Sequence, residues 1–414
     1  MLTGNRADTL PRPTGPAHDG TLSGNDAFIE DVREFLRVGL TPDLRQAGQQ
    51  TTGVHSPIDA CRIWHRRLYD RGWIAPSWPR EYGGTGWSVA RRFLFEQECA
   101  RHDAPILFAT GMRSIGPTII ALGSEEQKRR YLQPILTGED LWCQGFSEAG
   151  AGSDLAALTT RATPDNEFYV VTGRKLWTTG ADIANRMFAL VRTQVGNKPQ
   201  EGITFLLIDM ATPGIVVKPI ISLDGQHEFN EVEFNAACIP RANRLGAEND
   251  GWSVAKHLMR FARTNNTNSS VLRRAWRALE RSLAAQSCDM EAGLRARLTQ
   301  TEIDLVTFES LEMRLLAAGR LSGDDEAGSS LMKVTATELH QQIATLLLEL
   351  AGPYGAASPA LELCGGNVTN QGTFAVRKYL ATRAASIYSG TNEIHRNVLG
   401  KHLVAFDRSP SGTR

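Results

Sequence analysis

The feature that most constrains the fold is a change in the spacing of apolar residues along the chain. From about Asp26 to Asp140 they recur at helical spacing, and the same spacing returns after Gly251. Between about Leu141 and Leu245 short runs rich in β-branched and aromatic residues replace it: Phe168–Val171, Arg186–Arg192, Ile203–Ile208 and Gly214–Ile220. The order of helices, strands and helices predicts an α+β protein with a middle antiparallel β-domain.

Start and stop signals divide the helical parts further. Ser124 and Gln127 form a predicted capping box that opens a helix ending near Thr137. The other predicted helices cover Ile58–Arg71, Trp252–Gln286, Leu294–Ala318, Gly328–Leu350 and Asn392–Val404, with a loop from Gly352 to about Gln371. We therefore expect a tail at 1–25, a helical domain at 26–140, a β-domain at 141–246 and a C-terminal helical bundle at 247–414. A chain of 414 residues is also long enough for two or three domains.

The charge balance excludes some classes of partner. The chain carries 45 basic and 45 acidic residues, so its net charge does not favour nucleic acid. The sequence contains no run of roughly 18 apolar residues, so no membrane span is predicted.

The six cysteines are scattered, without a Cys-x-x-Cys pair or a His/Cys cluster, so we expect free thiols, no metal site and a reducing, cytoplasmic location. The first 25 residues lack an apolar signal core, and we interpret them as a mobile tail.

Three segments have the composition of a binding site. The first is Gln144–Leu155, where Gly150, Ala151 and Gly152 let the backbone approach a planar ring or a phosphate, although taken alone they are better explained as a turn between strands. The second is Gly173–Ala181, in which a Trp and two Thr could stack on a ring and bond its heteroatoms, or else pack in the core. The third is Ile387–Arg396, a helix start that favours a carbonyl or phosphate oxygen, or an ordinary N-cap.

The order and spacing of these segments resemble the acyl-CoA dehydrogenase family over nearly the whole chain after the tail. The most specific string is Gly-Phe-Ser-Glu-x-x-x-Gly-Ser-Asp at 145–154, and further matching strings are Trp78–Gly84, Gly123–Lys128, Lys175–Thr179, Glu248–Trp252 and Tyr388–Arg396. Trp142–Glu148 and Glu349–Gly355 look most like a bacterial branch that includes the pimeloyl-CoA dehydrogenase large subunit and some steroid side-chain dehydrogenases.

The resemblance implies an FAD site between the β-domain and the C-terminal helices. Thr179 would bond near the flavin N5, and Ser153 and Arg263 would contact substrate. The cofactor-binding residues implied are Gln144, Phe146, Ser147, Gly152, Ser153, Trp177, Thr178, Thr179, Thr391 and Glu393. The flavin would supply the redox chemistry and the protein its orientation.

The implied reaction is α,β-dehydrogenation of an acyl thioester carried by CoA or by a carrier protein. A carboxylate removes the α-proton while the β-hydrogen leaves as hydride. This sequence departs from the family here, because the two usual base positions hold Ala262 and Ser389, so the catalytic residue is not identified. Glu148 and Glu393 are weak candidates, since the first matches a structural position and the second a cofactor contact.

A second departure is the missing Arg-x-x-Phe-Gly string, with which many relatives reach a neighbouring subunit's FAD; the corresponding helix ends in Ala284–Cys288.

Three functions remain open. The chain is a dehydrogenase with its base elsewhere, a base-less subunit of a heteromeric dehydrogenase, or a flavoprotein of other chemistry such as oxygen activation.

The implied partners are an acyl thioester, an electron acceptor such as an electron-transfer flavoprotein, and further subunits. We expect a homo-oligomer or a hetero-oligomer with a second family subunit. The apolar stripe that would need cover is Leu294, Leu298, Leu305, Phe308, Leu311 and Leu315.

Overall fold

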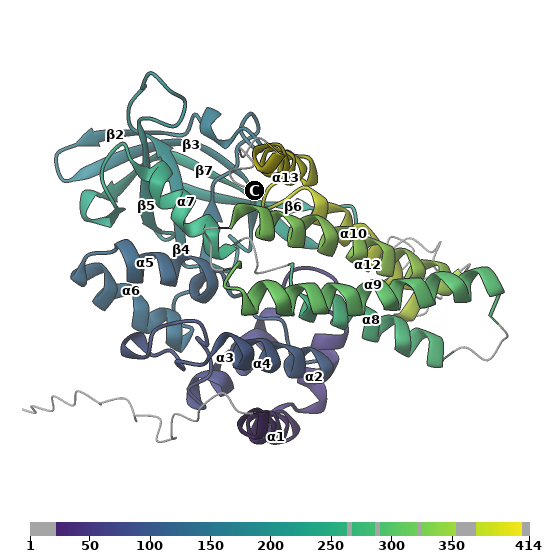
Figure 1. Ribbon diagram of the computed structural model, residues 1–414. Coiled ribbons are helices and arrows are strands. Elements are labelled where there is room, and N and C mark those ends of the chain that lie inside the picture. The colour runs from purple at the N-terminus through teal and green to yellow at the C-terminus, as the bar shows by residue number, and fades with distance from the viewer. Residues whose placement is uncertain (1–21, 263–266, 286–289, 322–324, 353–369, 408–414) are drawn as a thin grey trace, which may run out of the picture.

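The computed structural model describes residues 22–262, 267–285, 290–321, 325–352 and 370–407. The chain runs through helices, then a β-sheet, then helices again, as the apolar spacing predicted. Figure 1 shows the sheet at one end of the molecule, the N-terminal helices along one side, and the long C-terminal helices extending away from the sheet. This arrangement creates a junction where all three parts meet.

The N-terminal helices confirm the predicted capping box. Gln127 N donates to Ser124 Oγ at 3.2 Å, and Ser124 N donates to Gln127 Oε1 at 3.1 Å. The elements are α1 (Leu22–Gly39), α2 (Pro42–Gln49), α3 (Ile58–Asp70), α4 (Val89–Arg101), a π-helix (Gly111–Ile115), α5 (Gly116–Leu122) and α6 (Glu125–Thr137).

Trp78 holds the loop after α3 against these helices. It is only 2% exposed, and its Nε1 donates to the carbonyl of Met112 in the π-helix at 2.7 Å. A Cβ on Gly116 would lie 2.1 Å from the Trp78 ring, so only glycine allows this approach. The contact holds the loop after α3 against the π-helix and the start of α5.

The sheet has eight strands: β1 (Trp142–Gly145), β2 (Arg161–Asp165), β3 (Phe168–Thr179), β4 (Arg186–Arg192), β5 (Ile203–Asp209), β6 (Ile215–Ile221), β7 (His227–Pro240) and β8 (Arg244–Leu245). Their order is β6-β7-β3-β2-β4-β5-β8, with β1 beside β4. The expectation of an antiparallel domain is corrected to a mixed sheet, because β1 and β2 each pair with β4 in parallel. The long connection over residues 146–185 permits the parallel β1–β4 pair, which a tight turn does not.

The described residues of the C-terminal part form the α-helices α7 (Gly251–Ala262), α8 (Ser269–Ala284), α9 (Ala292–Ala317), α10 (Glu326–Leu350), α12 (Asn370–Arg383) and α13 (Asn392–Asp407). The single stretch predicted over Trp252–Gln286 is wrong, because it contains two helices. Asn268 opens the second by accepting a bond from Val271 N at 3.2 Å, and asparagine favours such caps over helix interiors. The sequence analysis did not predict α12, and most of the loop predicted before it, residues 353–369, lies outside the described residues.

The apolar stripe of α9 is covered within the chain itself. Its central members are buried against α8 and α10 in one cluster: Leu298, Leu305, Phe308 and Leu315. The stripe therefore does not require another subunit. The opposite side of α9 exposes Ile303, Val306 and Met313. No helix in the described ranges is long and apolar enough to cross a membrane.

Candidate functional site

The first predicted segment leaves β1 and folds back on itself. Glu148 and Ala151 exchange backbone hydrogen bonds of 2.9 and 3.1 Å, which makes a tight turn. A Cβ added to Gly150 or Gly152 would meet no atom within 4 Å. The backbone of this turn is therefore open to a ligand.

A buried ion pair joins this turn to the second segment. Lys175 Nζ, on β3, lies 2.8 Å from Glu148 Oε1 and also donates to Phe146 O at 3.2 Å. Lys175 is 0% exposed and Glu148 is 8% exposed. Leu176 N donates to Ser147 O at 2.8 Å, which extends the connection along the strand. The structure thus brings the first two segments together.

The Glu148 carboxylate has all the partners that its charge needs. Besides Lys175, it accepts bonds from Thr159 N at 2.7 Å, Thr159 Oγ1 at 2.8 Å and Thr160 N at 3.0 Å. Burial alone would raise the pKa of this carboxyl, but the Lys175 ammonium and the hydrogen bonds outweigh it and lower the pKa to about 2. Glu148 is therefore an ionised structural group at neutral pH.

The second segment presents an indole ring at the surface. Trp177 is 56% exposed and has φ of 60° beside a register shift between β3 and β7. Its ring centroid lies 6.1 Å from that of Phe229. A bulge of this kind re-aims a side chain, so the sequence alternative of core packing does not apply to Trp177.

Its two neighbours differ in exposure. Thr178 is 1% exposed, and its hydroxyl has no hydrogen-bond partner among the described residues. Thr179 is half-buried. Phe146, in the first segment, is buried, and its ring centroid lies 5.6 Å from that of Phe188, so its side chain packs in the core.

The third segment is held by α10 and α13. Lys333 Nζ, on α10, donates to Ala385 O at 2.6 Å and to Tyr388 O at 2.8 Å. His395 Nε2 lies 3.1 Å from Ser389 O, so this nitrogen must donate. Ser389 has φ of 57°, an unusual conformation for a residue with a Cβ that these contacts hold in place.

The side chains of this loop have different surroundings. Ser389 and Glu393 are exposed, whereas Thr391 is half-buried and accepts a bond from Ile394 N at 3.3 Å. Burial lowers the pKa of Lys333 to about 8. Ala262 ends α7, and Arg263 lies outside the described residues.

A junction that the sequence analysis missed lies next to the second segment. Glu228, on β7, accepts a bond from Val54 N at 2.6 Å, and Lys378 Nζ, on α12, donates to Thr52 O at 3.2 Å. The loop between α2 and α3 is thus bound by both other parts of the molecule. Gly180 N, immediately after Thr179, donates to Glu228 O at 3.0 Å. Nothing in the local sequence distinguishes Glu228 from an ordinary polar strand residue.

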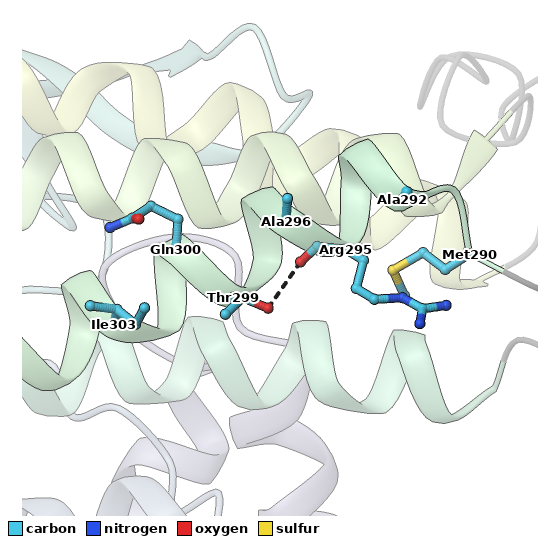
Figure 2. A pocket seen from close by; sticks show the side chains of 7 residues that line it. All are labelled: Met290, Ala292, Arg295, Ala296, Thr299, Gln300 and Ile303. Atoms are coloured by element: carbon cyan, nitrogen blue, oxygen red, sulfur yellow. Dashed lines mark hydrogen bonds between the residues drawn. The ribbon is translucent and has the colours of Figure 1, made fainter.

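A hollow of about 570 Å³ lies elsewhere, along α9 (Figure 2). Its lining comprises Met290, Ala292, Arg295, Ala296, Thr299, Gln300 and Ile303. None of these residues belongs to the three segments, and the hollow is an open groove of the helix surface. We therefore place the candidate site at the segments and not in this hollow. The described residues contain no group of three or more potential metal ligands.

Comparisons with known proteins match the whole architecture. The family models "Acyl-CoA dehydrogenase, N-terminal domain", "middle domain" and "C-terminal domain" match residues 24–139, 143–237 and 249–404. The chain is similar to acyl-CoA dehydrogenase IpdE1 of Mycobacterium tuberculosis, with 33% identity over 93% of this chain and 100% of the relative. It is also similar to the mitochondrial short-chain specific acyl-CoA dehydrogenase of Homo sapiens, with 27% identity over 92% and 90% of the two chains.

Two solved structures have the same fold. One is described as the Tcur3481-Tcur3483 steroid ACAD, with a TM-score of 0.79, 25% identity and coverage of 93% of this chain and 98% of that chain. The other is the ChsE4-ChsE5 complex from Mycobacterium tuberculosis, with a TM-score of 0.76, 26% identity and coverage of 94% and 99%.

We predict that Glu148→Gln lowers the free energy of unfolding by about 3–5 kcal/mol, because it leaves the Lys175 ammonium buried without its counter-charge. Urea unfolding measures the change, and Glu167→Gln, in an exposed turn, is the control. The folded pKa of Glu148, about 2, lies below the usual 4.5, so its contribution is present above pH 4.5 and is lost as the pH falls towards 2. A loss below about 1 kcal/mol at pH 7 would contradict this role of the pair.

Proposed function

The chain belongs to the acyl-CoA dehydrogenase family of flavin oxidoreductases, and we propose that it catalyses the α,β-dehydrogenation of an acyl thioester. The observation that carries this proposal is the linkage of the turn at 148–151 to the strand that presents Trp177. The buried ion pair holds the turn and the strand in place, and the backbone of the turn stays open at Gly150 and Gly152.

Members of this family bind FAD, and the surface fits such a group. The exposed Trp177 ring offers a face for a flat ring system, and the open backbone at Gly150 and Gly152 allows close approach. Thr179 is proposed to bond the flavin edge, with Gln144, Ser147 and Ser153 nearby. When bound, FAD supplies the acceptor for the hydride.

The start of α13 is proposed to complete the cofactor site. The helix dipole favours a carbonyl or phosphate oxygen at this helix start, beside Thr391 and Glu393. Lys333 and His395 fix the preceding loop, so these groups are positioned before a ligand arrives. The protein's contribution is orientation and hydrogen bonding.

A second candidate function is that of one subunit in a heteromeric dehydrogenase. Two observations favour it. Ala262 and Ser389 stand at the positions where the resemblance places the family's base. The descriptions of two similar structures each name two protein components. A serine is a poor base without an activating partner, and alanine has no acid–base group. In this form a second family subunit supplies the missing carboxylate.

Anaerobic mixing of the FAD-loaded protein with a panel of acyl-CoA thioesters tests the main proposal. Bleaching of the flavin absorbance by at least one thioester is the expected result. Bleaching only after a second family subunit is added supports the heteromeric form. Reduction by a general reductase, without any response to thioesters or to an added subunit, contradicts both.

We predict that Lys333→Met raises the dissociation constant for FAD at least about tenfold, because the carbonyls of residues 385 and 388 lose their shared donor. Titration of the apoprotein with FAD measures the change. Lys401→Met, on the exposed part of α13, is the control. Unchanged FAD affinity would show that the loop at 385–391 does not depend on Lys333 for cofactor binding.

We predict that Ala262→Glu accelerates flavin reduction by simple saturated acyl-CoA thioesters at least about tenfold, since a general base typically contributes about 10²-fold or more. Ala262→Gln is the matched control, because it adds the same volume without a base. Ser389→Glu is expected to gain less. Flavin reduction that is no faster in Ala262→Glu than in Ala262→Gln would contradict the prediction.

A further inference from the structure

The proposed reaction needs an acceptor for the α-proton, and the two carboxylates that the sequence suggested do not suit this role. Glu148 is bound by Lys175 and three further donors, and its pKa is lowered to about 2. Glu393 is exposed on α13, and its own backbone N–H and the Thr391 hydroxyl lower its pKa. A weakly basic, already satisfied carboxylate is a poor proton acceptor.

Glu228 has a different position. It lies on β7 beside the end of β3, where Phe229 pairs with Thr179 and contacts the Trp177 ring. Its backbone carbonyl accepts the bond from Gly180 N. The residue is therefore fixed by the same strand pair that presents Trp177, one position away from the partner of Thr179.

The Glu228 carboxylate points towards the N-terminal part of the molecule. One oxygen accepts a bond from Val54 N at 2.6 Å, and a Cβ on Gly53 would lie 2.4 Å from it. The side chain is only partly exposed, and no second hydrogen bond to the carboxylate is present among the described residues. The carboxylate is thus held on one side and keeps acceptor capacity for a substrate group.

Four charged or titratable groups face Glu228: His55 from the loop between α2 and α3, Asp224 before β7, Lys378 from α12 and Tyr388 from the loop before α13. Burial raises the pKa of Glu228 above the usual 4.5, although the Val54 bond and the charges of His55 and Lys378 act in the opposite direction. Lys378 is 8% exposed, and burial lowers its pKa to about 8. These groups surround the Glu228 carboxylate where the three parts of the chain meet.

We propose that Glu228 accepts the α-proton of the acyl thioester in place of the carboxylates absent from positions 262 and 389. This inference rests on the proposed function and names its base. The α C–H bond breaks, its proton goes to a Glu228 oxygen, and its electron pair forms the α,β double bond. The β-hydrogen leaves with two electrons to FAD, which is reduced, so that atoms and electrons balance.

The test uses the FAD-loaded full chain and acyl-CoA thioesters in D₂O, with two readouts. Mass spectrometry follows exchange of the α-hydrogen for deuterium, and absorbance follows flavin reduction. Glu228→Gln is expected to slow both at least about 10²-fold, while the oxidised flavin spectrum stays unchanged. Glu228→Asp is expected to retain an intermediate exchange rate, and Glu231→Gln, on the same strand, to match the unmodified protein.

A pH profile separates proton transfer from a structural role. Exchange by the unmodified protein is expected to rise with pH through the titration of Glu228, because only the ionised carboxylate accepts a proton. In Glu228→Gln the exchange rate is expected to lack this rise with pH. In the double variant Ala262→Glu/Glu228→Gln, recovery of exchange shows that the site remains folded and that a carboxylate was the missing group.

Two results overturn the inference. Exchange at the unmodified rate in Glu228→Gln excludes Glu228 as the base while leaving the proposed dehydrogenation intact. Exchange that appears only with an added second subunit places the base in that subunit, which also leaves the proposed reaction intact. The proposed function itself fails separately, when no thioester exchanges its α-hydrogen or bleaches the flavin under either condition.

Discussion

The buried pair of Glu148 and Lys175 is the interaction on which the rest of the candidate site depends. Two separate stretches of chain, the turn after β1 and the end of β3, are joined by it, by the bond from Lys175 Nζ to Phe146 O and by the bond from Leu176 N to Ser147 O. Lys175 has no exposure to water, so its charge is tolerable only with the carboxylate opposite it. The pair therefore fixes the register at which Trp177 leaves the strand and reaches the surface.

The sequence predicted the order of the elements well because apolar spacing reports directly on which face of a helix or strand is buried. It also located the capping box at Ser124 and four of the strands. The parallel pairs of β4 were not predictable from local pattern, since pairing depends on a connection forty residues long, 146–185. The break between α7 and α8 was missed because apolar residues on both sides continue at helical spacing, while Asn268 caps a new helix.

The candidate site was predicted in part, for a related reason. Segments such as 145–154 have a distinctive composition, so the sequence alone was enough to predict that they belong to a binding surface. The exposure of Trp177 depends on a register shift, and Thr178 is turned inward by the same irregularity. Glu228 and Lys378 carry no local signal at all. Their significance comes only from the loop between α2 and α3, which brings residues far apart in sequence within hydrogen-bond distance.

The position of Glu228 also bears on why the loop at 389 can exist without a carboxylate. Ser389 has a left-handed backbone conformation. Lys333 and His395 hold it by donating hydrogen bonds to the backbone carbonyls of residues 388 and 389, and not to the Ser389 side chain. The loop's geometry is therefore independent of the residue that it presents. A chain with this arrangement can lose the acid at 389 without losing the shape of its site. The demand for a proton acceptor then falls on a carboxylate at another wall of the same junction, and Glu228 is fixed there by the strand pair that carries Trp177.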